Sequence, residues 1–185
     1  KLKDYACAFV NIKNFNYINR AVGARKGDVV LREFVRLSQN MLEKDEFFAR
    51  MGGDNFVLLA KKEHMGNLLK KIGNQYVTVS NEDKQITFDV RSRIGVYDIR
   101  ENQNTGEVIN AASTAMHVAK MSGKTDMLHF DDTMLEKALR QKEVSQMFPN
   151  ALENQEFEVF YQPKVTLSDN QLCGCEALVL SLIHI

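Results

Sequence analysis

The apolar residues of this chain follow two periods, which predict strands and helices respectively. Residues 5–12 form a continuous apolar run, as in a buried strand, and residues 85–95 alternate as in a half-exposed strand. A third stretch has apolar residues at spacings of four, three and four, which place them on one helix face: Val30, Phe34, Leu37 and Met41. This mixture predicts an α+β domain in which helices pack on a largely antiparallel sheet.

The same patterns and the glycines between them predict the remaining elements. Further strands are expected at 47–51, 56–60, 127–130, 157–161 and 172–178, and further helices at 15–22, 65–72 and 107–122. A last helix can be capped by Asp131 or Asp132 and is expected to stop near Pro149-Asn150. Four of its apolar residues are expected to face a core: Leu135, Ala138, Leu139 and Met147.

Composition limits the classes of partner. The 185 residues carry 24 basic and 24 acidic side chains, so no broad nucleic-acid or membrane surface is expected. No apolar run is long enough to span a bilayer, and no secretory signal opens the chain. Cys7, Cys173 and Cys175 are too few for a disulfide framework, which favours a reducing, cytoplasmic location.

The segment Met51-Gly-Gly-Asp-Asn-Phe56 is the most specific chemical signal. Gly52 and Gly53 permit a tight turn and close approach of a ligand to the backbone, and the flanking strands make this turn the tip of a β-hairpin. Asp54 and Asn55 place a carboxylate and an amide at that tip.

This segment resembles the signature loop of GGDEF domains, the diguanylate cyclase family, except that Asn55 replaces the usual glutamate. Two further segments extend the resemblance over most of residues 5–130: 11–28 is similar to the family's D-x-D-x-F-K-x-x-N and G-H-x-x-G-D motifs, and 112–124 to its A-D-x-A-x-Y-x-A-K-x-x-G-R motif. The resemblance implies a nucleotidyl-cyclase-like, ferredoxin-like antiparallel sheet with flanking helices. It also implies that the family's segment before the first strand is missing.

The resemblance assigns a nucleotide-binding role to four residues. Asn19 and Asp28 match the family's readers of the guanine edge of GTP, a task suited to an amide and a carboxylate. Lys120 and Lys124 match its phosphate-binding cations. The alternative is that Asn19 and Asp28 merely cap or link helices, and that the lysines complement a helix dipole.

The positions that bind metal in this family carry fewer carboxylates here than is usual. The family holds two divalent cations with carboxylates of the first strand and the hairpin, but Asn11 and Asn55 stand at two of these positions and Asp54 alone remains anionic. Asn16 likewise stands where a phosphate-contacting lysine is usual. Magnesium prefers anionic oxygen, so we expect Mg²⁺ binding to be weak or lost and cyclase activity to be lost.

The family's product-inhibition motif, R-x-x-D, falls on Glu43 and Glu46. A glutamate in place of arginine repels the phosphates of a cyclic dinucleotide, so feedback through this site is not expected. Arg50 remains just before the glycines, where it could equally be a surface strand residue.

The last residues resemble the opening of an EAL domain, a family of cyclic-di-GMP phosphodiesterases with a TIM-type barrel. Gln162 lies in a Y-Q-P segment and matches a ligand-contacting glutamine, while Glu176 in an E-A-L-V segment matches the first metal carboxylate. The resemblance implies Mg²⁺ for a complete EAL domain, of which only the first strands are present. The expected domains are 1–131 (GGDEF-like), 132–152 (linker helix) and 153–185 (EAL fragment).

Three functions remain open at this point. The leading one is a degenerate cyclase domain that binds GTP and regulates an attached phosphodiesterase. The second is a weakly active diguanylate cyclase that uses Asp54 and makes cyclic-di-GMP. The third is a structural domain that forms a homodimer or separates the barrel from upstream sensors.

Overall fold

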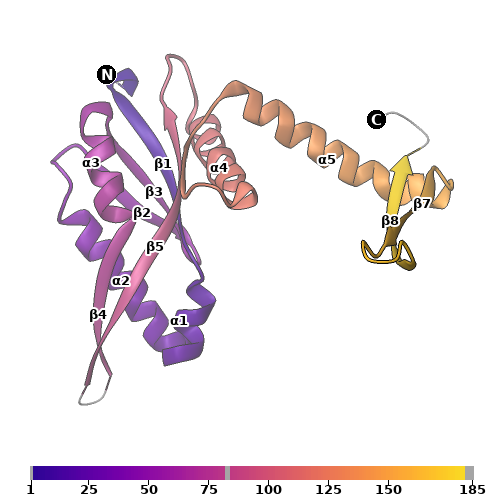
Figure 1. Ribbon diagram of the computed structural model, residues 1–185. Coiled ribbons are helices and arrows are strands. Elements are labelled where there is room, and N and C mark those ends of the chain that lie inside the picture. Colours follow the sequence, from indigo (N-terminus) through magenta and orange to yellow (C-terminus); the bar gives the residue numbers. More distant parts are fainter. Residues whose placement is uncertain (1, 82–83, 182–185) are drawn as a thin grey trace. The chain divides into compact units, whose positions relative to one another are not determined.

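The computed structural model describes residues 2–81 and 84–181, without the side chains at 81, 84, 135, 138, 141 and 181. It divides into two compact units, one ending at Leu135 and one beginning at Glu136 (Figure 1). Within the described residues, no helix combines the length and hydropathy that a membrane span requires.

The first unit alternates strands and helices. In chain order its elements are η1 (Leu2–Asp4), β1 (Tyr5–Ile12), α1 (Phe15–Val22), α2 (Ala24–Gln39), β2 (Phe47–Gly52), β3 (Asn55–Lys61), α3 (Lys62–Ile72), β4 (Asn74–Asn81), β5 (Lys84–Asp98), α4 (Thr105–Ser122) and β6 (Met127–His129). The strands form one sheet in the order β2-β3-β1-β5-β4, with β6 added beside β5. All pairs are antiparallel except β5–β6. The mixed fold with a central, largely antiparallel sheet and flanking helices is therefore confirmed.

Strand β1 lies in the middle of the sheet and contributes to a core on each face. Its even-numbered residues from Ala6 to Ile12 pack with side chains of α2 and α3, while Cys7 packs with α4. This division follows from the alternation of side chains along a strand, and Figure 1 shows α2 and α3 on the face opposite α4. Burial raises the pKa of the Cys7 thiol to about 11, so this thiol stays protonated near neutral pH.

Helix α4 approaches the sheet closely because position 95 is a glycine. A Cβ at Gly95 would lie 2.1 Å from the carbonyl oxygen of Ala112 and 2.2 Å from the amide nitrogen of Met116. Only a residue without a side chain permits this contact, which fixes α4 against β5.

The predicted elements are largely found, with one strand missed. β4 is absent from the predicted elements, which pass from the helix at 65–72 directly to the strand at 85–95. Gly73 does close α3, donating from its amide to the carbonyl of Leu69 at 2.8 Å, but the chain then extends at once. The alternation of buried Val77 and Val79 with exposed neighbours was the available signal. Helix α3 also begins at Lys62 rather than at residue 65.

Helix α5 (Asp132–Glu153) begins as expected, since Asp131 Oδ1 accepts a hydrogen bond from the Thr133 amide at 2.8 Å. The expected stop near Pro149 is wrong. An interior proline removes one hydrogen bond and disfavours the helix locally, but α5 continues through Pro149 to Glu153, and the Asn154 amide bonds to the Asn150 carbonyl at 2.9 Å. Burial of Leu139 and Met147 is also wrong, because each is 53% exposed; the side chains of Leu135 and Ala138 lie outside the described residues.

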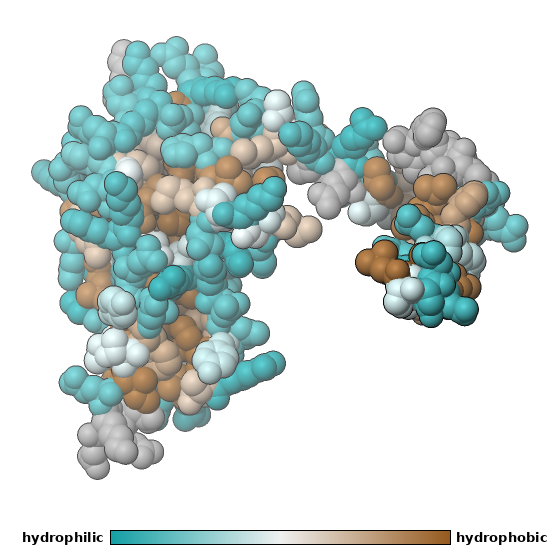
Figure 2. Space-filling view, viewed as in Figure 1, coloured by the Kyte–Doolittle hydropathy of each residue, from teal (hydrophilic) through white to brown (hydrophobic). Residues whose placement is uncertain are grey.

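The second unit contains most of α5, from Glu136 onward, followed by a hairpin of β7 (Phe157–Val165) and β8 (Leu172–Ser181). Among its described side chains Ala151 alone is buried, and large apolar residues of the hairpin are exposed: Val159, Phe160, Tyr161, Leu178 and Val179. Figure 2 shows hydrophobic surface, coloured brown, on this unit. The two strands pair antiparallel, whereas neighbouring strands of a TIM-type barrel run parallel. The incomplete barrel and the domain boundaries stay predictions.

Candidate functional site

The glycine turn between β2 and β3 has the geometry that requires glycine. Gly52 and Gly53 have φ angles of 152° and 56°, a region that side chains disfavour. Arg50 Nε donates to the Gly53 carbonyl at 2.7 Å, and Asn55 Nδ2 donates to the Gly52 carbonyl at 3.3 Å. The turn is therefore held by side chains of the strands that it connects.

Asn11 of β1 and Asn55 of β3 are register partners, and their side chains meet. Asn11 Nδ2 donates to Asn55 Oδ1 at 2.9 Å, and Asn11 is only 8% exposed. The Ile12 amide donates to the Asp54 carbonyl at 3.0 Å, which holds the hairpin tip against the end of β1. We call the group Asn11, Gly52, Gly53, Asp54 and Asn55 the hairpin end.

Lys13 adds positive charge beside the hairpin end. Its ammonium bonds to both carboxylate oxygens of Asp126, at 2.7 and 2.9 Å, and Arg93 Nε lies 3.9 Å from the same carboxylate. Sequence reasoning missed Lys13, although it occupies the second aspartate position of the D-x-D motif and so carried the signal. The pair also ties the loop before β6 to the end of β1.

The donors at the hairpin end do not fit the two-metal site that the resemblance implies. Mg²⁺ prefers carboxylates, phosphates and water in octahedral geometry. Asp54 is the one carboxylate of the hairpin end, and the amide oxygen of Asn55 already accepts from Asn11. Over residues 2–81 and 84–181, no group of three or more His, Cys, Asp or Glu side chains is placed to hold a metal.

Asn19 of α1 and Asp28 of α2 lie on adjacent helices, and with Gly27 they form what we call the helix end. Neither residue caps α2, which begins at Ala24 after Gly23, so the capping alternative is wrong for Asp28. The Asp28 side chain is 60% exposed and available to a ligand. Asn19 Oδ1 is buried without a hydrogen-bond partner in the described structure. A Cβ on Gly27 would lie 1.8 Å from that oxygen, so the Asn19 side chain can adopt this position only because residue 27 is a glycine.

Arg50 contacts both the hairpin end and the helix end. Besides its bond to Gly53, its Nη2 lies 3.5 Å from Asp28 Oδ1. The hairpin turn and the helix end therefore share one side chain, which competes with any ligand that would donate to Asp28.

Lys120 and Lys124 lie at the end of α4 and just after it, around Gly123 with a φ of 62°. Both are exposed, and neither has an ion pair with another described residue. Since Lys13 and Asp126 join this loop to β1, the two lysines belong to the same edge of the sheet as the hairpin end.

Glu43 and Glu46, at the expected inhibitory motif, form an internal network. Glu46 accepts from the amides of Glu43 at 3.0 Å and Lys61 at 3.2 Å, and its Oε1 lies 3.1 Å from His64 Nδ1. Burial alone raises the pKa of Glu46, but these hydrogen bonds lower it more, so the pKa lies below its usual value. Glu43 in turn pairs with Lys61 at 3.2 Å and with His64 at 3.4 Å. Both carboxylates are thus engaged within the protein.

In the second unit, Gln162 and Glu176 are register partners across β7 and β8. Lys164 Nζ lies 3.2 Å from Glu176 Oε2, and both side chains are more than half exposed. The hairpin therefore places the predicted glutamine and glutamate side by side, with a lysine on the carboxylate.

Comparison with known proteins identifies the first unit. The family model described as "Diguanylate cyclase, GGDEF domain" matches residues 2–126. MucR of Pseudomonas aeruginosa, a bifunctional diguanylate cyclase/cyclic di-GMP phosphodiesterase, is 28% identical over 182 residues, which are 95% of this chain and 26% of MucR. The chain spans about a quarter of the length of the curated relatives it matches.

Solved structures agree. An EAL/GGDEF domain protein from M. capsulatus is 27% identical with a TM-score of 0.56, over 69% of this chain and 84% of that chain. The GGDEF domain of DgcB from Caulobacter crescentus, solved in complex with c-di-GMP, is 18% identical with a TM-score of 0.59, over 68% of this chain and 74% of that one. The second likeness is one of fold alone.

Proposed function

The chain belongs to the diguanylate cyclase GGDEF domain family, and from this premise we propose that it is a cyclic-di-GMP signalling module that has lost cyclase chemistry. In this proposal the domain binds GTP at the helix end and regulates an attached EAL phosphodiesterase. The observation that carries it is the hydrogen bond between Asn11 and Asn55, two neutral amides at positions where the family has metal carboxylates.

The amide pair removes most of the field that phosphoryl transfer needs. Removing one preorganised electrostatic group from an active site typically costs about a hundred- to a thousandfold in rate. Two carboxylates are replaced here, and the ammonium of Lys13 is close enough to engage Asp126 at the same sheet edge. Asp54 alone cannot balance two dications, so the site favours loss of turnover.

Guanine recognition is supported by what the helix end retains. Asp28 offers an exposed carboxylate, which can accept from the two donors on the guanine edge, and Asn19 offers an amide on the adjacent helix. Lys120 and Lys124, both exposed and without a described ion pair, are suited to phosphates. Nucleotide binding therefore does not depend on the lost carboxylates alone.

The regulatory role rests on the second unit. The alignment with MucR covers 182 residues, so it continues past residue 126, where the family model ends. Gln162 and Glu176 lie beside each other on the hairpin, as a shared binding surface would require. We propose that this hairpin is the beginning of an EAL domain and that a metal would be held there only in the complete protein.

Calorimetry with GTP and ATP, each with and without Mg²⁺, tests nucleotide binding. We expect GTP to bind at least about tenfold more tightly than ATP, which corresponds to about 1.4 kcal/mol. Asp28→Asn should remove this preference, while the matched control Asp45→Asn, exposed before β2, should keep it. Equal binding of the two nucleotides would contradict guanine recognition.

Chromatography of the same mixtures tests the loss of catalysis, since no cyclic-di-GMP should form. Accumulation of the product by the wild-type chain, abolished in Asp54→Ala, would establish a residual cyclase instead. In the full-length protein, phosphodiesterase activity should change on addition of GTP, and this change should be absent in Asp28→Asn.

A further inference from the structure

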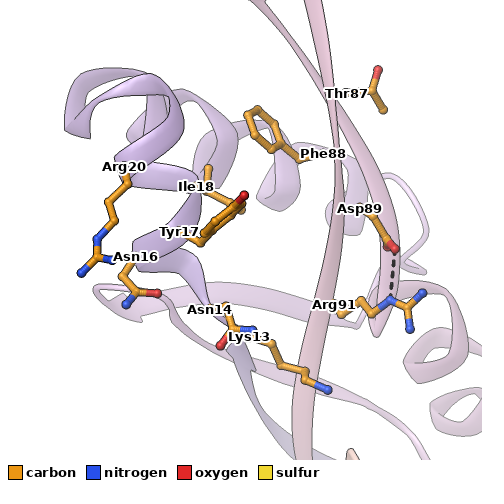
Figure 3. Close-up of a pocket in the computed structure, with 10 residues that line it drawn as sticks. All are labelled: Lys13, Asn14, Asn16, Tyr17, Ile18, Arg20, Thr87, Phe88, Asp89 and Arg91. Atoms are coloured by element: carbon orange, nitrogen blue, oxygen red, sulfur yellow. Dashed lines mark hydrogen bonds and ion pairs between the residues drawn. The ribbon is translucent and has the colours of Figure 1, made fainter.

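A cavity of about 780 Å³ lies between α1 and β5, and it reaches Lys13 beside the hairpin end, while no residue of the helix end lines it. One wall comes from the start of α1 and the loop before it, the other from β5 (Figure 3): Lys13, Asn14, Asn16, Tyr17, Ile18 and Arg20, facing Thr87, Phe88, Asp89 and Arg91. Tyr17 is two residues from Asn19, about 200° around the helix, so it projects from the opposite side of α1. The volume is within the range of ligand clefts.

One edge of β5 opens into this cavity. Residues 84–91 of β5 pair with β4, whereas β1 joins the other edge of β5 only from Ser92 onward. The first half of β5 therefore has a described strand neighbour on one side alone. An edge of this kind presents backbone donors and acceptors that can pair with another extended chain.

The hydrogen bonds of β5 show which residues present these groups. The backbone N–H and C=O groups of even-numbered residues point toward β4 and β6. The amide of Ser92 donates to the Gly73 carbonyl at 3.0 Å, and the amide of Ile94 donates to the Asp126 carbonyl at 2.8 Å. The carbonyl of Arg91 points to the other side and accepts from the Lys13 amide at 2.8 Å. Because N–H and C=O directions alternate along a strand, those of Thr87 and Asp89 point with Arg91, toward the cavity.

The side chains around this edge are aromatic and mainly cationic. Tyr17 is 74% exposed, Phe88 is half-buried against the core, and Figure 3 shows both rings directed into the space between α1 and β5. Three cations and one carboxylate line the cavity. Lys13 pairs with Asp126, and Arg91 with Asp89, whereas Arg20 has no ion pair within the described part of the chain.

We propose that this cavity, which we call the β5 groove, binds an extended acidic peptide segment that adds to the free edge of β5. Thr87 and Asp89 supply main-chain hydrogen bonds, Tyr17 and Phe88 contact an apolar side chain, and Arg20 and Arg91 receive the acidic ones. Strand addition of this kind takes its affinity from the main chain and its specificity from pockets for alternate side chains. The proposed readers of guanine, Asn19 and Asp28, do not line this groove.

The acetylated and amidated peptide EVEVEV is a direct probe, because it alternates acidic and apolar residues. Titrated into the ¹⁵N-labelled chain, it should shift the amide resonances of Thr87 and Asp89 and slow their hydrogen exchange. KVKVKV should bind at least about tenfold more weakly, because it repels the cations, and EVEVEV N-methylated at alternate positions should lose most of its affinity. The same shifts with KVKVKV or with the methylated peptide would overturn the proposal, as would no binding of EVEVEV at millimolar concentration.

Matched variants locate the site. Tyr17→Ser and Arg20→Gln should each weaken EVEVEV binding about three- to tenfold, whereas Tyr76→Ser, 73% exposed on β4, and Arg32→Gln, exposed on α2, should not. Asp28→Asn should leave peptide binding unchanged, so failure here is distinguishable from failure of guanine recognition. If GMP rather than EVEVEV shifts Thr87 and Asp89, the groove is a small-molecule site and the peptide proposal is wrong.

Discussion

The hairpin end and the helix end of the candidate site differ in how far their polar side chains are already engaged within the protein. At the hairpin end, the side chains satisfy one another: Asn11 bonds to Asn55, and Arg50 holds the turn. At the helix end, Asp28 stays exposed and Asn19 keeps a buried oxygen without a described partner. A region whose side chains bond to one another has few polar groups left for a ligand, whereas the exposed carboxylate of Asp28 can still accept hydrogen bonds from one. This difference is the reason for our proposal that the domain binds a nucleotide without converting it.

Restoring the carboxylates at the hairpin end is the most direct way to break this comparison. We expect Asn11→Asp combined with Asn55→Glu to lower the free energy of unfolding by about 1–3 kcal/mol in EDTA, because two charges join Asp54 without a counterion. Mg²⁺ should recover this loss and raise the affinity for GTP about a hundredfold, an effect of about 2.8 kcal/mol. Thermal unfolding and calorimetry measure both changes.

The control for this variant is Asn110→Asp, which adds charge on an exposed face of α4. It should respond to Mg²⁺ no more than the wild type does. If Mg²⁺ stabilises the wild-type chain as much as the double variant, then the amide pair already holds a metal and the comparison fails.

Filling the space beside Asn19 tests the helix end. In Gly27→Ala the new Cβ would lie 1.8 Å from Asn19 Oδ1 and 3.3 Å from the ring of Phe15, so the amide must move. We expect this variant to bind GTP about tenfold more weakly and to lose its preference for GTP over ATP. Its free energy of unfolding should fall by about 1–3 kcal/mol, because the core is overpacked. Gly66→Ala, with nothing within 4 Å on α3, should instead gain up to about 1 kcal/mol and bind GTP normally. Unchanged selectivity in Gly27→Ala would exclude Asn19 from recognition.

The stability conferred by Glu46, at the base of the β2–β3 hairpin, should depend on pH. The pKa of Glu46 is lowered in the folded state, so its contribution is complete above its unfolded value of about 4.5 and is lost as pH falls through the lower folded value. We expect this contribution to be about 1 kcal/mol, and Glu46→Gln should flatten the acid limb of the stability curve by that amount. Denaturant unfolding across this pH range measures it; parallel curves for wild type and variant would refute the assignment.

Releasing Asp28 from Arg50 should have the smallest effect. The two side chains are 37% and 60% exposed and their ion pair spans 3.5 Å, so it is worth well under about 1 kcal/mol. Arg50→Gln should therefore raise GTP affinity about two- to threefold, since the ligand no longer competes for the carboxylate. Weaker binding in this variant would mean that Arg50 contacts the nucleotide itself.

Sequence patterns predicted what depends on local signals. The strand at 5–12, the helix at 15–22 and the glycine turn each follow from periodicity or from residues that need positive φ. β4 was missed because its alternation begins directly after a helix-closing glycine. The contact of Lys13 with Asp126 joins residues 113 positions apart, and no local pattern reports such a pair.

The orientation of side chains at the site was also beyond the sequence. That Asn19 lies against Gly27 depends on how α1 packs on α2, and that Arg50 reaches Asp28 depends on where the hairpin lies. The motif identified the participating residues, while their engagement with one another follows from tertiary packing.

The bond between Asn11 and Asn55 has a consequence for the conditions under which these two strands stay joined by their side chains. An amide neither gains nor loses a proton at physiological pH, and it attracts no counterion. The hydrogen bond between Asn11 and Asn55 therefore does not depend on pH or on the concentration of free divalent cations.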